Sequence, residues 1–141
     1  MEISYAHFEI FVYGTLMREE CNHHWLKRAS FVRAAKTVKA YALIDLGGYP
    51  GMISGDYTVF GELFRVDTSL LLQLDQLEEH PDYYARSWIT LACGQRCLSY
   101  LFVDFEDLPQ PFEVFDNWKT YRRQKYGKFN TLYQGESCIN D

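Results

Sequence analysis

The residues from Thr68 to Glu79 have the apolar period of an α-helix. At about 100° per residue, four leucines fall on one stripe about 120° wide: Leu70, Leu71, Leu74 and Leu77. Asp67 precedes the run as an N-cap residue, and His80-Pro81 ends it because a residue before proline avoids the α region. The sequence therefore predicts one strong amphipathic helix near the middle of the chain.

Glu78 is the unusual residue of this helix. Its carboxylate falls inside the apolar stripe, between Leu71 and Leu74, whereas Glu79 points nearly opposite. Apolar surroundings and the negative end of the helix dipole both disfavour a carboxylate, so the pKa of Glu78 is expected to rise. Such a group suits proton transfer in an active site. The alternative is that the helix end frays and Glu78 simply reaches water.

Short strand-like runs surround this helix. Residues 8–13 form an apolar, aromatic run, and residues 57–66 form another in which Gly61 marks a bend or a close backbone approach. Residues 84–93 and 96–103 predict a hairpin. The remaining predictions are a short helix at 22–28, one or two strands within 32–46, a turn at 47–51, a loop at 107–111 and a polar helix at 116–125. Many strands, one strong helix and no regular βαβ alternation predict an α+β domain with a barrel-like sheet.

Length and charge limit the class of protein. A chain of 141 residues forms one ordinary domain, residues 1–141. Its 14 basic and 19 acidic side chains give a net charge of −5, which argues against binding nucleic acid or anionic membranes. The chain start lacks the features of a signal peptide, and no apolar run is long enough to span a bilayer. We therefore expect a soluble cytoplasmic protein whose four cysteines are reduced.

Several polar clusters suggest other chemistry. Cys93 and Cys97 could form a metal or redox pair, but the predicted hairpin makes them strand neighbours and a second ligand pair is missing. Cys21 lies beside two histidines, which leaves a Cys-His nucleophile open, but no distant cluster completes a metal site. We predict no metal. The basic run 119–128 is typical of a solvated helix face.

A glycosidase would need two carboxylates on opposite sides of one bond. Glu78 and Glu79 are adjacent and face different ways on a helix, so they cannot serve together. A pair formed by Glu78 and Glu62 stays geometrically open.

The run Phe11-Val-Tyr-Gly-Thr-Leu16 is the second informative feature. A buried strand that breaks at a glycine can aim successive backbone N–H groups into a cleft and hold an anion there.

Six short motifs then occur in order: Phe11 to Leu16, Asn22 to Leu26, Tyr49-Pro50, Val59 to Leu63, Leu74 to Glu78 and Tyr83 to Arg86. The chain resembles the γ-glutamylcyclotransferase-like superfamily, particularly its small bacterial and γ-glutamylamine cyclotransferase-type members. The resemblance covers residues 8–104, and residues 105–141 form a C-terminal extension without a usable motif.

The resemblance implies a small mixed β-barrel flanked by helices. It further implies an enzyme that needs no cofactor and converts a small γ-glutamyl amine or amide into 5-oxoproline and a free amine, with Glu78 as general acid and base. The implied substrate-binding residues are Tyr13, Gly14, Thr15 and Leu16, mainly through backbone groups, and Tyr84. The chain departs from the family at Glu79, where glycine is common, which bears on substrate preference.

Two other classes of function remain open. One is a binding module that keeps the pocket without turnover, and the other is an amide hydrolase or acyl transferase that uses the same pocket.

Overall fold

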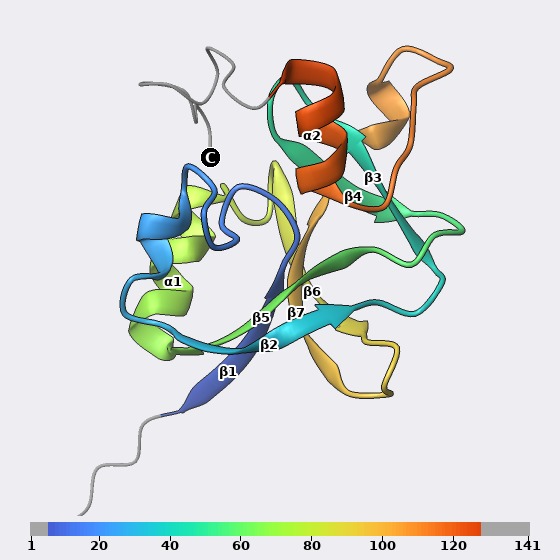
Figure 1. Cartoon of the computed structure of the whole chain (residues 1–141). Helices are drawn as coiled ribbons and strands as arrows, with labels where there is room; N and C mark the ends of the chain where they lie inside the picture. Colours follow the sequence, from blue (N-terminus) through green and yellow to red (C-terminus); the bar gives the residue numbers. More distant parts are fainter. Residues whose placement is uncertain (1–5, 128–141) are drawn as a thin grey trace, which may run out of the picture.

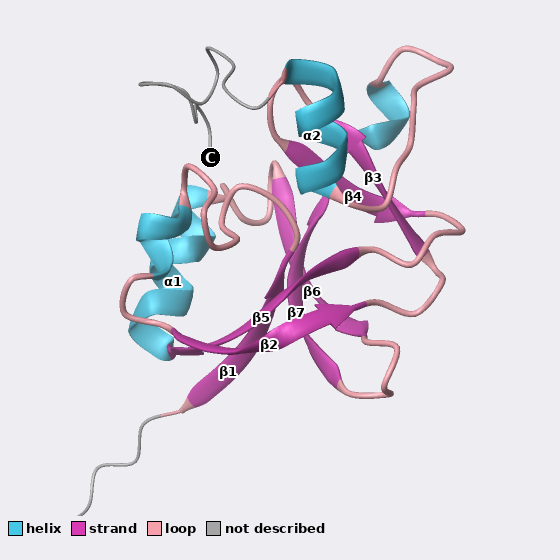
Figure 2. Cartoon of the chain, in the orientation of Figure 1, coloured by secondary structure: helices cyan, strands magenta, loops and turns pink. Residues whose placement is uncertain are grey.

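The structure is a computed structural model of the chain, and it describes residues 6–127. Figure 1 shows the course of the chain, and Figure 2 separates helices from strands. The elements in chain order are β1 (His7–Val12), η1 (His23–Leu26), β2 (Ser30–Lys36), β3 (Tyr41–Asp45), β4 (Pro50–Ser54), β5 (Phe60–Asp67), α1 (Thr68–Leu77), β6 (Tyr84–Thr90), β7 (Arg96–Phe102), η2 (Phe105–Asp107) and α2 (Trp118–Tyr126).

The strands of the described residues form one mixed seven-stranded sheet in the order β2-β5-β1-β7-β4-β3, with β6 paired to β7. The α+β class is confirmed, whereas these pairings do not show that the sheet closes into a barrel. Strand β7 has three neighbours. Because β6 pairs antiparallel along the whole of one edge of β7, β1 and β4 share the other edge. Strand β1 meets that edge at Leu98 and β4 meets it at Leu101, so the sheet splits between β1 and β4.

Helix α1 forms where its leucines predict it. Asp67 caps it by accepting a hydrogen bond from the backbone N–H of Leu70 at 2.8 Å. Leu70, Leu71 and Leu74 are buried, and the helix packs against β5 and β1. Each fully buried leucine contributes about 1.5–3 kcal/mol to folding. The apolar stripe therefore fixes α1 on the sheet and sets where its C-terminal end lies.

Gly61 is a close approach, as predicted. A Cβ atom there would lie 2.6 Å from Cζ of Phe11 and would also clash with the backbone oxygen of Val12. The hairpin of β6 and β7 is confirmed as well, with Thr90 opposite Arg96 at its turn end.

Two expectations were wrong. The predicted turn at 47–51 extends only to Tyr49, because β4 begins at Pro50 and pairs with β3 and β7. The first two residues of β4 are proline and glycine, which are typical of turns. The strand forms because it pairs with β3 and β7. Cys21 is disulfide-bonded rather than reduced, whereas Cys93 and Cys97 are free.

Between residues 6 and 127, no helix is long and apolar enough to cross a membrane. The same part of the chain holds no group of three or more His, Cys, Asp or Glu side chains arranged to hold a metal ion.

Candidate active site

The split in the sheet is the site of a pocket with an empty volume of about 350 Å³, which includes open solvent at its mouth. The end of β1, the start of β4 and the C-terminal end of α1 converge there. The pocket is lined by Phe11, Val12, Tyr13, Gly14, Thr15, Leu16, Tyr49, Pro50, Glu78, Tyr84 and Tyr100. All six residues predicted for the site, namely Tyr13, Gly14, Thr15, Leu16, Glu78 and Tyr84, therefore line one pocket.

The hydroxyl of Tyr13 bridges the split between the strands. It donates a hydrogen bond to the backbone oxygen of Tyr100 on β7 at 2.6 Å and accepts one from the N–H of Met52 on β4 at 3.2 Å. Because both backbone groups are buried, this hydroxyl satisfies polar atoms that diverging strands would leave unpaired. Tyr13 thus holds the floor of the pocket together.

The loop after β1 places backbone donors at the pocket. Thr15 is fixed by Asn22, whose side chain donates to Oγ1 of Thr15 at 3.2 Å and whose backbone N–H donates to the Thr15 carbonyl at 2.9 Å. The backbone N–H groups of Thr15 and Leu16 donate to no acceptor in the described part of the chain. Both residues are buried and line the pocket, so these N–H groups suit an anionic or carbonyl oxygen.

Glu78 lies at the C-cap of α1, where its N–H donates to the carbonyl of Leu74 at 2.9 Å. The next two N–H groups, of Glu79 and His80, donate to the carbonyls of Gln76 at 3.2 Å and of Asp75 at 2.9 Å. This pattern is a Schellman motif, so the helix end is hydrogen-bonded rather than frayed. The Glu78 side chain is half-buried and lines the pocket.

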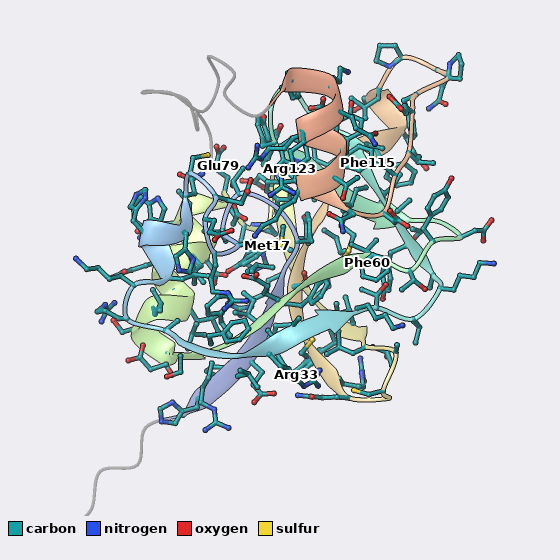
Figure 3. All side chains as sticks on the ribbon, viewed as in Figure 1. Met17, Arg33, Phe60, Glu79, Phe115 and Arg123 are labelled. Carbon is teal, nitrogen blue, oxygen red and sulfur yellow. The ribbon has the colours of Figure 1, made fainter. Side chains whose placement is uncertain are left out.

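Glu79 is the left-handed residue of that motif, with φ = 55°, and it is exposed. Figure 3 labels it at the end of α1. The two consecutive glutamates face different ways, as predicted, but the left-handed turn at Glu79, after α1 has ended at Leu77, is what separates them: Glu78 lines the pocket and Glu79 does not.

Tyrosines form another part of the pocket lining. The hydroxyl of Tyr84 donates to the Pro50 carbonyl at 2.7 Å, which fixes the start of β4. The hydroxyl of Tyr49 lies 2.7 Å from that of Tyr83. These contacts give the pocket an aromatic wall whose members hold one another in place.

Tyr100, which lines the pocket, begins a chain of hydrogen bonds through Asp75 to Arg86. Its hydroxyl donates to Oδ1 of Asp75 at 2.6 Å, and Oδ2 of Asp75 accepts from Arg86. Burial, and then the hydrogen bond to and the charge of Asp75, raise the pKa of Tyr100 far above its ordinary value. Tyr100 is therefore a neutral phenol whose oxygen still presents lone pairs. Sequence reasoning missed it, because nothing local distinguishes it from other aromatic residues in strands.

The other polar clusters lie elsewhere. Cys21, His23 and His24 do not line the pocket, and neither do Cys93 and Cys97. Glu62 is buried and accepts hydrogen bonds from the backbone N–H of Arg18 at 2.8 Å and from its guanidinium at 3.4 Å. It is thus engaged in fixing the loop after β1 and does not share the pocket with Glu78.

The fold and the pocket define a class: a small α+β protein with a half-buried glutamate and a loop of backbone donors in one pocket. The family model described as "Gamma-glutamyl cyclotransferase, AIG2-like" matches residues 10–124. The chain belongs to this family of γ-glutamyl cyclotransferase enzymes.

Individual relatives agree. A putative γ-glutamylcyclotransferase of Vibrio cholerae is 44% identical over 85 residues, which cover 60% of this chain and 74% of that protein. The γ-L-glutamyl-butirosin B γ-glutamyl cyclotransferase of Niallia circulans is 33% identical over 124 residues, covering 82% of this chain and 78% of that protein. A crystal structure of an AIG2-like protein from Mus musculus matches with a TM-score of 0.73 at 25% identity, covering 79% of this chain and 88% of that one.

Proposed function

We propose that this chain is a cyclotransferase that acts on a γ-glutamyl amine or γ-glutamyl amide and releases 5-oxoproline and a free amine. In this proposal Glu78 is the general base and then the general acid, and Tyr13, Gly14, Thr15, Leu16 and Tyr84 bind the substrate. The observation that carries the proposal is that one pocket places the Glu78 carboxylate together with the uncommitted N–H groups of Thr15 and Leu16.

The chemistry needs only one titratable group. Glu78 takes a proton from the α-ammonium group of the substrate, and the neutral amine attacks the γ-carbonyl carbon of the same molecule. The five-membered ring closes, its nitrogen loses a second proton, and the C–N bond to the departing amine breaks. Glu78 carries the protons to that amine, which leaves as an ammonium ion. Because the nucleophile belongs to the substrate, the pocket accelerates the reaction mainly by holding a folded conformer. General acid–base catalysis adds a factor of about 10²–10⁴.

The reaction also needs donors that stabilise negative charge on the substrate's oxygen atoms, and in the proposal the N–H groups of Thr15 and Leu16 supply them. In the proposal they bind either the α-carboxylate of the substrate or the oxyanion that develops on the γ-carbonyl. Both are oxygen atoms with negative charge, and fixed N–H donors at a buried site stabilise such charge strongly. The aromatic residues Tyr49 and Tyr84 then limit the access of water, which favours attack by the internal amine over hydrolysis.

The test compares the wild-type protein with Glu78→Gln and with Glu79→Gln as a matched control. Each is incubated with γ-glutamylamines and γ-glutamyl dipeptides, and 5-oxoproline and free glutamate are measured by mass spectrometry. We expect 5-oxoproline from the wild type and from Glu79→Gln. We expect Glu78→Gln to keep its melting temperature and to lose a factor of about 10²–10⁴ or more in rate.

Other outcomes select the other classes of function. Free glutamate in place of 5-oxoproline would indicate an amide hydrolase. Saturable stabilisation by a substrate without any product would indicate a binding module. Equal turnover by the wild type and by folded Glu78→Gln would remove Glu78 from the mechanism.

A further inference from the structure

Helix α2 contacts both loops that carry the pocket walls, although none of its residues lines the pocket. One loop, residues 13–22, contains the backbone donors. The other, residues 45–49, leads into the wall formed by Tyr49 and Pro50. Figure 1 shows α2 above the sheet, with the loop after β1 running between α1 and α2. The helix belongs to the part of the chain that carried no sequence motif, and the proposed function gives it no role.

The contact with the 13–22 loop is a buried, two-pronged ion pair. Nε and Nη2 of Arg122 donate to Oε1 and Oε2 of Glu20 at 2.9 and 2.8 Å. The side chain of Glu20 is 1% exposed and that of Arg122 is 11% exposed. Lys119 adds a hydrogen bond from Nζ to the Arg18 carbonyl at 2.8 Å. A bidentate pair fixes orientation as well as distance, so α2 determines where this loop lies.

The contact with the 45–49 loop uses a carboxylate as a common acceptor. Oδ2 of Asp45 accepts from the hydroxyls of Tyr121 at 3.0 Å and of Tyr126 at 2.6 Å. Oδ1 of Asp45 accepts from the backbone N–H groups of Gly47 and Gly48, each at 2.9 Å. The Asp45 carboxylate therefore joins α2 to the turn that leads to Tyr49 and Pro50 in the pocket wall.

Helix α2 is itself packed firmly against the rest of the protein. The two loops are therefore both attached to the same rigid element. Trp118 is fully buried, and the ring of Tyr121 stacks on Phe115 with a centroid distance of 3.7 Å. Phe115 in turn exchanges two backbone hydrogen bonds with Leu43 of β3, at 2.8 and 3.0 Å.

We propose that α2 is a strap that sets the spacing of the two pocket walls, and that Arg122 is a positioning residue that acts on turnover through Glu20. This inference rests on the proposed function for its effect on rate. The walls meet where Gly14 packs against Pro50, so a shift of either loop changes the width of the pocket. A misplacement of about 1 Å can cost a factor on the order of 10² in rate, even when the altered residue is remote from the chemistry.

The variants must separate positioning from mere stability. Arg122→Met leaves Glu20 charged, buried and without its partner, so this variant is expected to lose stability. The double variant Arg122→Met/Glu20→Met replaces the ion pair with apolar side chains of similar length and leaves neither a charge nor an amide stranded at position 20. Arg122→Lys keeps the charge and loses the planar two-pronged geometry. Arg123→Met is the matched control, because Arg123 is an exposed arginine one position away on the same helix (Figure 3).

The first readout is the kcat/KM for release of 5-oxoproline, measured beside the melting temperature. We expect the double variant to melt close to the wild type and to lose about 10–100-fold in kcat/KM. Arg122→Lys should also lose turnover while folded, and Arg123→Met should match the wild type. Recovery of kcat/KM together with the melting temperature in the double variant would overturn the positioning role, as would full activity of Arg122→Lys.

The second readout does not depend on activity. Hydrogen exchange of peptides from residues 13–22 should speed up in the double variant and in Arg122→Lys, and exchange of the α1 amides should stay unchanged. Unchanged exchange in the 13–22 loop would overturn the proposal that α2 holds this loop in place. If the wild type forms no 5-oxoproline from any substrate, the proposed function fails, and hydrogen exchange still decides whether α2 fixes the loop.

Discussion

Gly14 and Pro50 lie so close that a Cβ atom on Gly14 would stand 2.7 Å from Cδ of Pro50 and would also clash with its Cγ. The two residues belong to opposite walls of the pocket, one from the loop after β1 and the other from the first position of β4. The absence of a side chain at position 14 is therefore a condition for the walls to meet. This contact explains the glycine of the Tyr13-Gly-Thr motif by packing rather than by backbone conformation.

Gly14→Ala is expected to push the walls apart. The added methyl group overpacks a site between a loop and a strand, which costs about 1–3 kcal/mol in the free energy of unfolding. Because the donors of Thr15 and Leu16 move with the loop, kcat/KM should fall on the order of 10–100-fold. Steady-state turnover and urea unfolding measure the two effects.

Pro50→Ala in the Gly14→Ala background is the control for this prediction. It removes the ring atoms that the new methyl group would meet, so it should restore part of the lost turnover. Full activity of Gly14→Ala alone would show that the close approach does not position the donors.

Glu79→Gly is expected to stabilise the protein. Glu79 occupies the left-handed position of the Schellman motif with φ = 55°, where a side chain costs roughly 1–2 kcal/mol and glycine costs little. The flexibility of glycine in the unfolded chain offsets part of that gain, so the expected increase in the free energy of unfolding is about 0.5–1 kcal/mol. Urea denaturation of the wild type and the variant gives this difference.

Glu79→Ala separates the backbone effect from the charge effect. Both substitutions remove a negative charge from the C-terminal end of α1, where the helix dipole disfavours it. Only glycine also relieves the strain of the left-handed backbone conformation at position 79. If the alanine variant proved as stable as the glycine variant, strain at position 79 would not be the cause.

The sequence predicted the parts of the fold that local patterns determine. The leucine spacing located α1, Asp67 located its first turn, and the run from Phe11 to Leu16 located the loop at the pocket. The helical spacing predicted that Glu78 and Glu79 face different ways, and they do, although the helix ends at Leu77 and the left-handed turn at Glu79 is what separates them. Each of these features depends on residues within one or two turns of chain, which a sequence displays directly.

Features that depend on distant partners were not predictable. Strand β4 exists because β3 and β7 pair with it, and its own proline and glycine suggest a turn. Tyr100 lies in the pocket because β7 lies at the split of the sheet. The role of Arg122 requires Glu20, a residue 102 positions away. No local pattern encodes these relationships, because each depends on residues that are distant in the sequence.

Asp45 provides a pH test of the contact between α2 and the 45–49 loop. Burial alone would raise the pKa of Asp45, but hydrogen bonds from Tyr126, Gly48, Gly47 and Tyr121 outweigh burial and lower it. Since the folded pKa lies below the unfolded value of about 3.9, the stabilisation is present above that value and is lost as pH falls through the folded pKa.

Asp45→Asn should therefore be less stable than the wild type at pH 7, by about 1–3 kcal/mol for the lost charge-assisted hydrogen bonds. The difference should shrink below about pH 4, where the carboxylate becomes protonated first in the unfolded chain, and should vanish as pH falls through the lower folded pKa. Urea unfolding at pH 7, 5 and 3 measures it, with Asp56→Asn as an exposed control that shows little difference at pH 7. A deficit of the same size at every pH would mean that the charge of Asp45 is not what joins α2 to the pocket wall, and that shape alone holds the contact.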